Sequence, residues 1–226
     1  DQAAQLGFPG AAIEIAAAAA RLRFLAGDSA CTREVEDQLA RTPPNALPLM
    51  ARPYLPLAYF YAVVGHPSVA RAWLARYERD VPTAWRGPDS WMRHRVLSAV
   101  LLAEGAPDAA LRELRAGERV VPVRVGMFDE PFVRMSAEPE RGRVFVQLGA
   151  VDSAIATYER YLAMRWLPRT GVDAFELAPA LQELITLHEQ RGDSARAAGY
   201  RRRLGTLRRM ADARYERPGS AAAPQR

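Results

Sequence analysis

Histidine and cysteine are the side chains of this sequence best suited to catalysis or metal binding, and they are few. The chain has three histidines, His66, His94 and His188, and one cysteine, Cys31. The intervals between the histidines, without carboxylates at matching spacing, fit no metal site. One cysteine can form neither an intrachain disulfide nor a cysteine metal cluster. We therefore interpret the histidines as structural residues and Cys31 as a small buried thiol.

Sequence motifs for bound cofactors and for nucleophilic catalysis are also missing. No glycine-rich phosphate loop follows a strand pattern, and no serine elbow motif occurs. We therefore predict that the chain is not an enzyme and needs no cofactor. The alternative is an enzyme whose carboxylate or histidine cluster forms only in the folded chain, which residue spacing would not show.

Arginine is the third chemically active side chain, and it dominates the charge. All 31 basic residues of the 226-residue chain are arginine, the formal net charge is +5, and the pI is about 9.8. This arginine- and alanine-rich composition indicates a GC-rich bacterial genome, so the charge favours acidic partners only mildly. Five arginines gather near the C-terminal end: Arg201, Arg202, Arg203, Arg208 and Arg209.

Two interpretations of this basic segment are open. Its arginines could contact the phosphates of a nucleic acid or an anionic membrane surface. However, each residue of a helix advances by about 100°, so consecutive arginines point in different directions. We favour the second interpretation, a helix that caps a repeat array and keeps its outer face polar.

Repeated glycines organise the elements that must position these side chains. Gly65, Gly105, Gly149 and Gly192 follow one another at intervals of 40, 44 and 43 residues, and a fainter copy at Gly27 precedes them by 38. Each glycine follows an apolar run with helical spacing, and an Asp, Ser or Pro soon after it can begin another helix. The pattern predicts a series of helix pairs.

Small residues at a fixed distance from these glycines support the pairing. An alanine lies five residues after each of the four clear glycines: Ala70, Ala110, Ala154 and Ala197. A small side chain there allows two antiparallel helices to approach closely. A larger apolar residue follows one turn later in three copies, as Leu74, Leu114 and Tyr158. We therefore predict helical hairpins.

The repeat resembles the tetratricopeptide repeat (TPR) over roughly residues 12–210. The glycine-to-alanine spacing, the aromatic residues Tyr61 and Phe145 four positions before a glycine, and the closing prolines Pro82 and Pro122 carry the resemblance. It departs from the family in its period, near 40 where about 34 is usual. The tryptophan typical of the first helix is also replaced, by Tyr54, His94, Glu138 and Leu181.

This resemblance implies an all-α fold. We expect a TPR-like α-solenoid of four to five antiparallel helix hairpins, with a right-handed superhelix and a basic C-terminal capping helix. The alanine- and arginine-rich sequence of these repeats is also similar to that of helical repeats that lie C-terminal in bacterial Ser/Thr kinases and transcriptional activators. Another type of α-solenoid is the alternative.

The expected organisation is a lead-in at 1–11, one repeat domain at 12–215 and a mobile Gly/Pro/Ala-rich tail at 216–226. The chain opens at Asp1 without Met, so we expect a processed form or a fragment. No apolar run is long enough for a membrane span. Four segments are expected to interrupt the helices: 41–53, 79–90, 119–136 and 164–176.

Aromatic residues in and beside these interruptions have two readings. They are Trp85, Phe128, Phe132 and Trp166. We expect them to pack over the ends of the hairpins. The alternative is a surface for a partner, because aromatic residues are enriched in interface cores.

The TPR resemblance also implies a binding surface on the concave side, formed by the first helix of each hairpin. Its residues would include Tyr59, Arg95, Arg143, Gln147, Gln182 and Glu189. Arg95 and Arg143 could clamp a carboxylate.

The function that follows is a non-catalytic scaffold that holds a peptide or partner protein within a larger bacterial signalling or membrane-associated assembly. Binding of nucleic acid or an anionic surface through the arginine-rich helix is the alternative. The compartment, bacterial cytoplasm or periplasm, stays open.

Overall fold

Helices make up the part of the chain that the structure describes. The computed structural model describes residues 9–87, 90–120, 130–164 and 169–215, and within them we find ten α-helices, three 3₁₀ turns and no β-strand. The helices are α2 (Pro9–Leu25), α3 (Thr32–Arg41), α4 (Tyr54–Val63), α5 (Pro67–Asp80), α6 (Ser90–Ala103), α7 (Pro107–Arg119), α8 (Glu130–Gln147), α9 (Val151–Ala163), α10 (Arg169–Gln190) and α11 (Ser194–Tyr215). The prediction of an all-α chain is confirmed.

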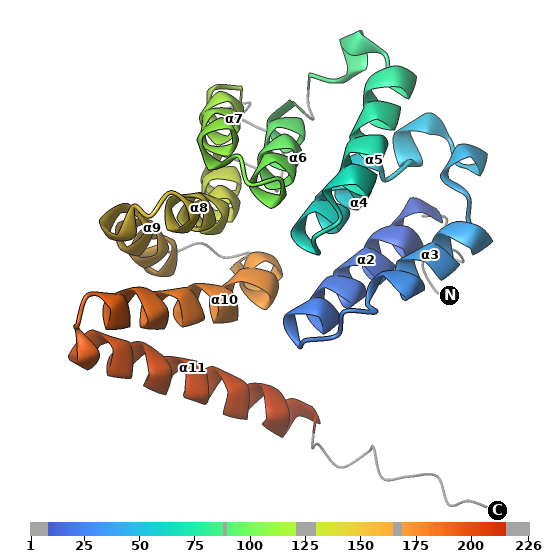
Figure 1. The fold of residues 1–226 in the computed structure, drawn as a ribbon. Helices are drawn as coiled ribbons and strands as arrows, with labels where there is room; N and C mark the ends of the chain where they lie inside the picture. Colours follow the sequence, from blue (N-terminus) through green and yellow to red (C-terminus); the bar gives the residue numbers. More distant parts are fainter. Residues whose placement is uncertain (1–8, 88–89, 121–129, 165–168, 216–226) are drawn as a thin grey trace, which may run out of the picture.

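Consecutive helices pack as pairs. The closest partners are α2 with α3, α4 with α5, α6 with α7, α8 with α9, and α10 with α11. We call the even-numbered helix of each pair its first helix. The pairs follow one another around an arc, so that α10 returns to the side of α2 (Figure 1). The first helices therefore face a common centre.

The repeated glycines end the first helix of every pair. Gly27, Gly65, Gly105, Gly149 and Gly192 all have positive φ, between 68° and 94°. The residue after each glycine donates its N–H to the carbonyl five positions earlier, as His66 does to Tyr61 over 2.8 Å. This is the hydrogen bond of a helix end with a left-handed glycine, a conformation that residues with a Cβ adopt only at a cost.

The alanines five residues after the glycines lie where paired helices touch. Ala70, Ala110, Ala154 and Ala197 are each 0% exposed. The larger residue one turn later is buried as well: Leu74, Leu114 and Tyr158. Gly142 of α8 makes an even closer contact, because a Cβ there would lie 2.5 Å from the Tyr158 ring. Small side chains thus set the distance between paired helices.

Two of the predicted interruptions are partly helical. Within 119–136 the helix α8 begins at Glu130, and within 164–176 the helix α10 begins at Arg169. The prediction was wrong there because it treated prolines as breaks. Pro131 stands in the first turn of α8 and Pro168 directly before α10, where a helix tolerates proline because its first N–H groups have no intrahelical partner.

The other two interruptions hold short 3₁₀ turns: Pro44–Ala46, Leu49–Ala51 and Thr83–Trp85. Trp85 is 51% exposed, so about half of this residue is covered by other parts of the chain. Phe128 and Trp166 lie outside the described residues, and Phe132 lies in α8 at a position whose side chain is not described.

The ends of the expected repeat domain differ slightly from the structure. The first described helix begins at Pro9, three residues before the expected boundary at 12. The remainder of the lead-in, residues 1–8, and the tail at 216–226 lie outside the described residues. Among the described helices, none has both the length and the apolar character needed to cross a bilayer.

Candidate functional site

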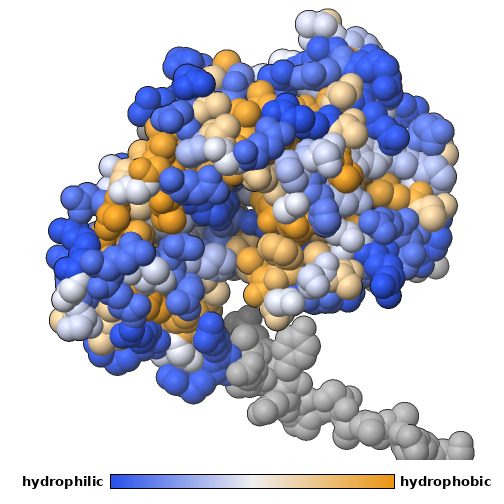
Figure 2. All heavy atoms as spheres, in the orientation of Figure 1, coloured by the Kyte–Doolittle hydropathy of each residue, from blue (hydrophilic) through white to orange (hydrophobic). Residues whose placement is uncertain are grey.

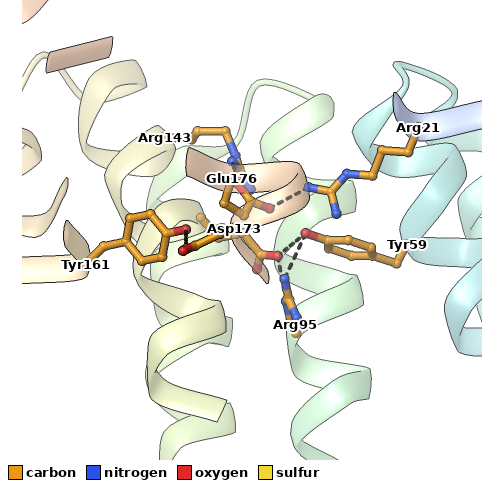
Figure 3. A network of polar contacts seen from close by, with 8 residues as sticks. Arg21, Tyr59, Arg95, Arg143, Tyr161, Asp173 and Glu176 are labelled. Atoms are coloured by element: carbon orange, nitrogen blue, oxygen red, sulfur yellow. Dashed lines mark hydrogen bonds and ion pairs between the residues drawn. The ribbon is translucent and has the colours of Figure 1, made fainter. Parts of the chain in front are cut away.

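Six polar side chains from the five first helices meet at the centre of the arc. We call them the central cluster, and Figure 3 labels all of them except Glu140 and shows how the labelled side chains point toward one another. They are Arg21 of α2, Tyr59 of α4, Arg95 of α6, Glu140 and Arg143 of α8, and Glu176 of α10.

Glu176 joins the first hairpin to the last. Arg21 Nη2 donates to its Oε1 over 2.5 Å, and Arg143 Nη1 donates to its Oε2 over 2.7 Å. Burial alone would raise the pKa of Glu176, but the positive charges of Arg143 and Arg21 outweigh burial and lower the pKa to about 2. Glu176 is therefore ionised at neutral pH and holds both arginines.

The beginning of α10 is fixed by a second contact. Tyr161 of α9 donates its hydroxyl to Asp173 Oδ1 over 2.5 Å, one turn before Glu176 (Figure 3). This bond ties α10 to α9 while Glu176 ties it to α2 and α8. The carboxylate of Glu176 is thus positioned by three neighbouring helices.

Glu140 is the other carboxylate of the cluster. It accepts hydrogen bonds from Arg95 Nε over 2.6 Å and from the Tyr59 hydroxyl over 2.5 Å. Burial raises the pKa of Tyr59, so its hydroxyl stays protonated and can donate. The guanidinium of Arg95 lies 4.7 Å from the centre of the Tyr59 ring, and that of Arg21 lies 5.3 Å from it. These cation–π contacts add to the ion pairs.

The residues predicted for the concave face lie in three places. Tyr59, Arg95 and Arg143 belong to the central cluster. Gln147 is exposed at the end of α8 and lines a cavity beside the cluster. Gln182 and Glu189 are exposed on α10, and Glu189 pairs with Arg201 of α11.

This arrangement bears on the predicted carboxylate clamp. Arg95 already pairs with Glu140, and Arg143 already pairs with Glu176. The two arginines thus hold carboxylates of the chain itself. Their binding to the carboxylate of a ligand stays a prediction.

A cavity of about 370 Å³ adjoins the central cluster, and we call it the central cavity. Figure 2 shows apolar residues bordering a hollow near the middle of the molecule. Its apolar walls come from α2, α4, α6 and α10 and include Phe24, Leu25, Val63, Leu102, Ala103 and Phe175. Its polar side chains are Arg21, Ser98, Glu140, Arg143 and Gln147, and three of them belong to α8.

The repeat explains most of this lining. Leu25, Val63, Ala103 and Gln147 stand two residues before their glycines, and Phe24, Ala62 and Leu102 stand three before. The helix α10 is the exception. It has 22 residues, compared with 10 in α4, and lines the cavity from its first half, at Phe175 and Pro179.

Sequence reasoning missed Arg21, Glu140 and Glu176. Arg21 lies six residues before its glycine, as do Tyr59 and Arg143, so the repeat could have identified it. Glu140 lies three residues before Arg143 and hence on the same helix face. Glu176 fell in a predicted interruption, so no helical pattern pointed to it.

The cysteine and the three histidines lie outside the central cluster. Cys31 is a free, buried thiol. His188 is buried and stacks on Tyr200, with 5.6 Å between ring centres, and His94 Nδ1 lies 2.7 Å from Glu113 Oε2. His66 is exposed in the turn between α4 and α5. Among the described residues, no group of three or more His, Cys, Asp or Glu side chains could hold a metal ion.

The basic residues of the C-terminal segment all lie on α11 and are exposed: Arg201, Arg202, Arg203, Arg208 and Arg209. Arg201 pairs with Glu189, and Arg209 donates to the Thr206 hydroxyl. The structure shows no ion pair between the other three and any described residue.

Comparison with known proteins adds no relative. No protein-family model, no curated protein and no solved structure matches the chain.

Proposed function

We propose that this protein is a non-catalytic, TPR-like scaffold that binds a peptide or partner protein on the concave side of its helical repeats. The scaffold would act within a larger bacterial signalling or membrane-associated assembly, without a cofactor. One observation carries the proposal: the first helices of all five hairpins border the same cavity of about 370 Å³.

The chemistry of the central cavity supports binding. It combines apolar walls with a few polar groups, which is typical of sites that orient a ligand through few hydrogen bonds. At its rim, Leu25 is 44% and Phe24 36% exposed. A partner that covered these side chains would bury apolar surface, which favours association.

The central cluster supports binding in a different way. Its ion pairs connect α2, α6, α8 and α10, so the walls of the cavity are held in place before any partner arrives. A site that is already ordered loses less conformational entropy on binding. In this proposal, the cluster shapes the surface and the rim makes the contacts.

A capture experiment with a matched pair of variants tests the proposal. Leu25→Arg places a charge at the rim, and Val69→Arg places one on α5 at a side chain of similar exposure, 39%. We expect a partner captured by the wild type and by Val69→Arg to be lost by Leu25→Arg. Equal capture by both variants would exclude this rim as the binding surface.

The exposed arginines of α11 support a second candidate function, binding of nucleic acid or an anionic membrane surface. Arg202, Arg203 and Arg208 are free of ion pairs with described residues, so their charges are available to phosphates. This function predicts binding that weakens steeply with salt and that polyanions compete away. Replacement of all three arginines by glutamine should abolish it.

A further inference from the structure

Three of the five polar side chains that line the central cavity form a stripe along α8, while the other two come from α2 and α6. Glu140, Arg143 and Gln147 follow one another at helical spacing, so they share one face of the helix. The other first helices contribute mainly apolar side chains to the cavity. A ligand there would meet the polar stripe of α8 on one side and mainly apolar groups on the others.

Two atoms of this stripe lack hydrogen-bond partners within the described part of the chain. Glu140 uses Oε1 for Arg95 and Tyr59, while its Oε2 is buried and unpaired. Arg143 uses Nη1 for Glu176, while its Nη2 is buried and unpaired. Buried polar atoms without a partner are uncommon in folded proteins, so each calls for an explanation.

The two unpaired atoms are of opposite kind and belong to residues on the same face of α8. One is an acceptor on an anion, and the other is a donor on a cation. Their residues are three apart on one helix, which separates the Cβ atoms by roughly 5–6 Å. A ligand that satisfies both must carry a donor and an acceptor near each other.

We propose that the central cavity binds a free α-amino acid with a large apolar side chain. Its carboxylate accepts a hydrogen bond from Arg143 Nη2, and its ammonium group donates one to Glu140 Oε2. The side chain lies among Phe24, Leu102 and Phe175. This inference does not rest on the partner protein proposed above, although the two binding sites share Phe24.

The charge balance of the central cluster favours a ligand of this class. A carboxylate alone would leave Glu140 Oε2 unpaired and lie close to two glutamates, whereas an amine alone would lie among three arginines. A zwitterion satisfies both atoms and adds no net charge to a buried cluster. The cavity volume, about 370 Å³, falls at the lower end of the range for small-molecule sites.

Both unpaired atoms are shielded from solvent, so binding requires the two side chains to turn toward the ligand. The side chain of Arg143 is 30% exposed and already lines the cavity, which leaves it room to turn. Since Glu140 stands one turn away on the same helix, one ligand can draw both groups to itself.

Calorimetric titration of the full chain with four probes tests the proposal. L-phenylalanine carries both charges, 3-phenylpropanoate only the acid, 2-phenylethylamine only the amine, and N-acetyl-L-phenylalaninamide a neutral donor and acceptor. We expect saturable binding of L-phenylalanine, about tenfold or more tighter than that of each analogue.

Each other outcome of the titration overturns the proposal in a recognisable way. Equal or tighter binding of the acid would mean that arginine alone recognises the ligand. Equal or tighter binding of the blocked amide would mean that the cavity takes a peptide unit. Equal or tighter binding of the amine would mean that the carboxylate is not recognised, and no binding of L-phenylalanine would mean that the cavity is not an amino-acid site.

A cavity-filling variant locates the site without disturbing the cluster. Ala103 lines the cavity and is exposed, so Ala103→Trp should fill its mouth and leave the fold intact, as circular dichroism can verify. Ala72→Trp, at an exposed position of α5, is the matched control. We expect L-phenylalanine binding to weaken more than about tenfold in Ala103→Trp only. Unchanged binding in that variant would place the ligand elsewhere and refute the proposal.

The two proposals can fail separately. Loss of partner capture in Leu25→Arg, without any amino-acid binding by the wild type, would refute only the amino-acid site. Amino-acid binding that Ala103→Trp removes, without a partner that depends on Leu25, would refute only the scaffold.

Discussion

Arginine occurs in two contrasting regions of this molecule. In the central cluster Arg21, Arg95 and Arg143 are largely shielded and hold two buried glutamates. On α11 six described arginines are exposed, Arg196 and the five of the basic segment, and Arg196 and Arg201 make their ion pairs at the surface. Every arginine counts equally toward the net charge of the chain, but only those of the central cluster connect helices that are distant in the sequence. What an arginine does here depends on where the fold places it.

The two regions should also differ in energy. Breaking a buried ion pair leaves a charge without solvent or partner, which costs about 3–5 kcal/mol. An exposed pair is screened by water and contributes about 0–1 kcal/mol. Four predictions test whether this contrast holds, beginning with the largest effect.

Removing the charge of Glu176 should have the largest effect. In Glu176→Gln, Arg21 and Arg143 lose their carboxylate, and we expect the free energy of unfolding to fall by about 3–5 kcal/mol, measured by urea denaturation at pH 7. The control is Glu183→Gln on the same helix. Burial raises the pKa of Glu183, so its charge is not stabilised, and its loss should be neutral or slightly stabilising. Similar losses of the free energy of unfolding in both variants would contradict the large contribution expected of the buried ion pairs.

Acid should reproduce the first effect in the wild type. The pKa of Glu176 is about 2 in the folded chain, below its ordinary value of 4.5. A carboxyl group whose pKa is lowered by folding stabilises the folded state at any pH above its ordinary pKa. That contribution disappears as the pH falls from about 4.5 to about 2. At pH 6 the free energy of unfolding of the wild type should exceed that of Glu176→Gln by about 3 kcal/mol. This difference should shrink as the pH falls from about 4.5 to about 2. A constant difference would mean that Glu176 is not the titrating group.

Removing Arg21 should have an intermediate effect. Arg21→Gln breaks the bond to Glu176 and the stacking on Phe175 and Tyr59, but Arg143 still pairs with Glu176. We expect a loss of about 1.5–3 kcal/mol in urea denaturation. The nearby Arg23 is half-exposed and pairs with Asp28 and Glu34, so Arg23→Gln should reduce the stability much less, because water screens exposed ion pairs. If the two variants were equally stable, the link between α2 and α10 would contribute little.

Replacing arginines of α11 should have the smallest effect. The test is the triple variant Arg202→Gln, Arg203→Gln, Arg208→Gln. Because these side chains are exposed, we expect each replacement in it to alter the free energy of unfolding by no more than about 0.5 kcal/mol. Thermal unfolding of the variant and the wild type measures the difference. A loss above about 2 kcal/mol would show that α11 depends on its charges as the central cluster does.

Much of the fold could be predicted from local signals. The five glycines mark the ends of the first helices because glycine adopts a positive φ easily, which is a property of the residue itself and not of distant contacts. The buried alanines follow these glycines at a fixed spacing. The same spacing indicated Tyr59 and Arg143 and could have indicated Arg21. The starts of α8 and α10 were mispredicted because a helix tolerates proline in or directly before its first turn.

The amino-acid sequence by itself determined that the chain forms paired helices and where the first helix of each pair ends, because these features depend on residues that are near one another along the chain. Only the tertiary structure decided that α10 returns to α2, that Glu176 meets Arg21 across 155 positions, and that the predicted carboxylate-binding arginines hold carboxylates of the same chain. These contacts depend on the curvature of the whole arc. Small rotations between successive hairpins set that curvature, and no single repeat records their sum.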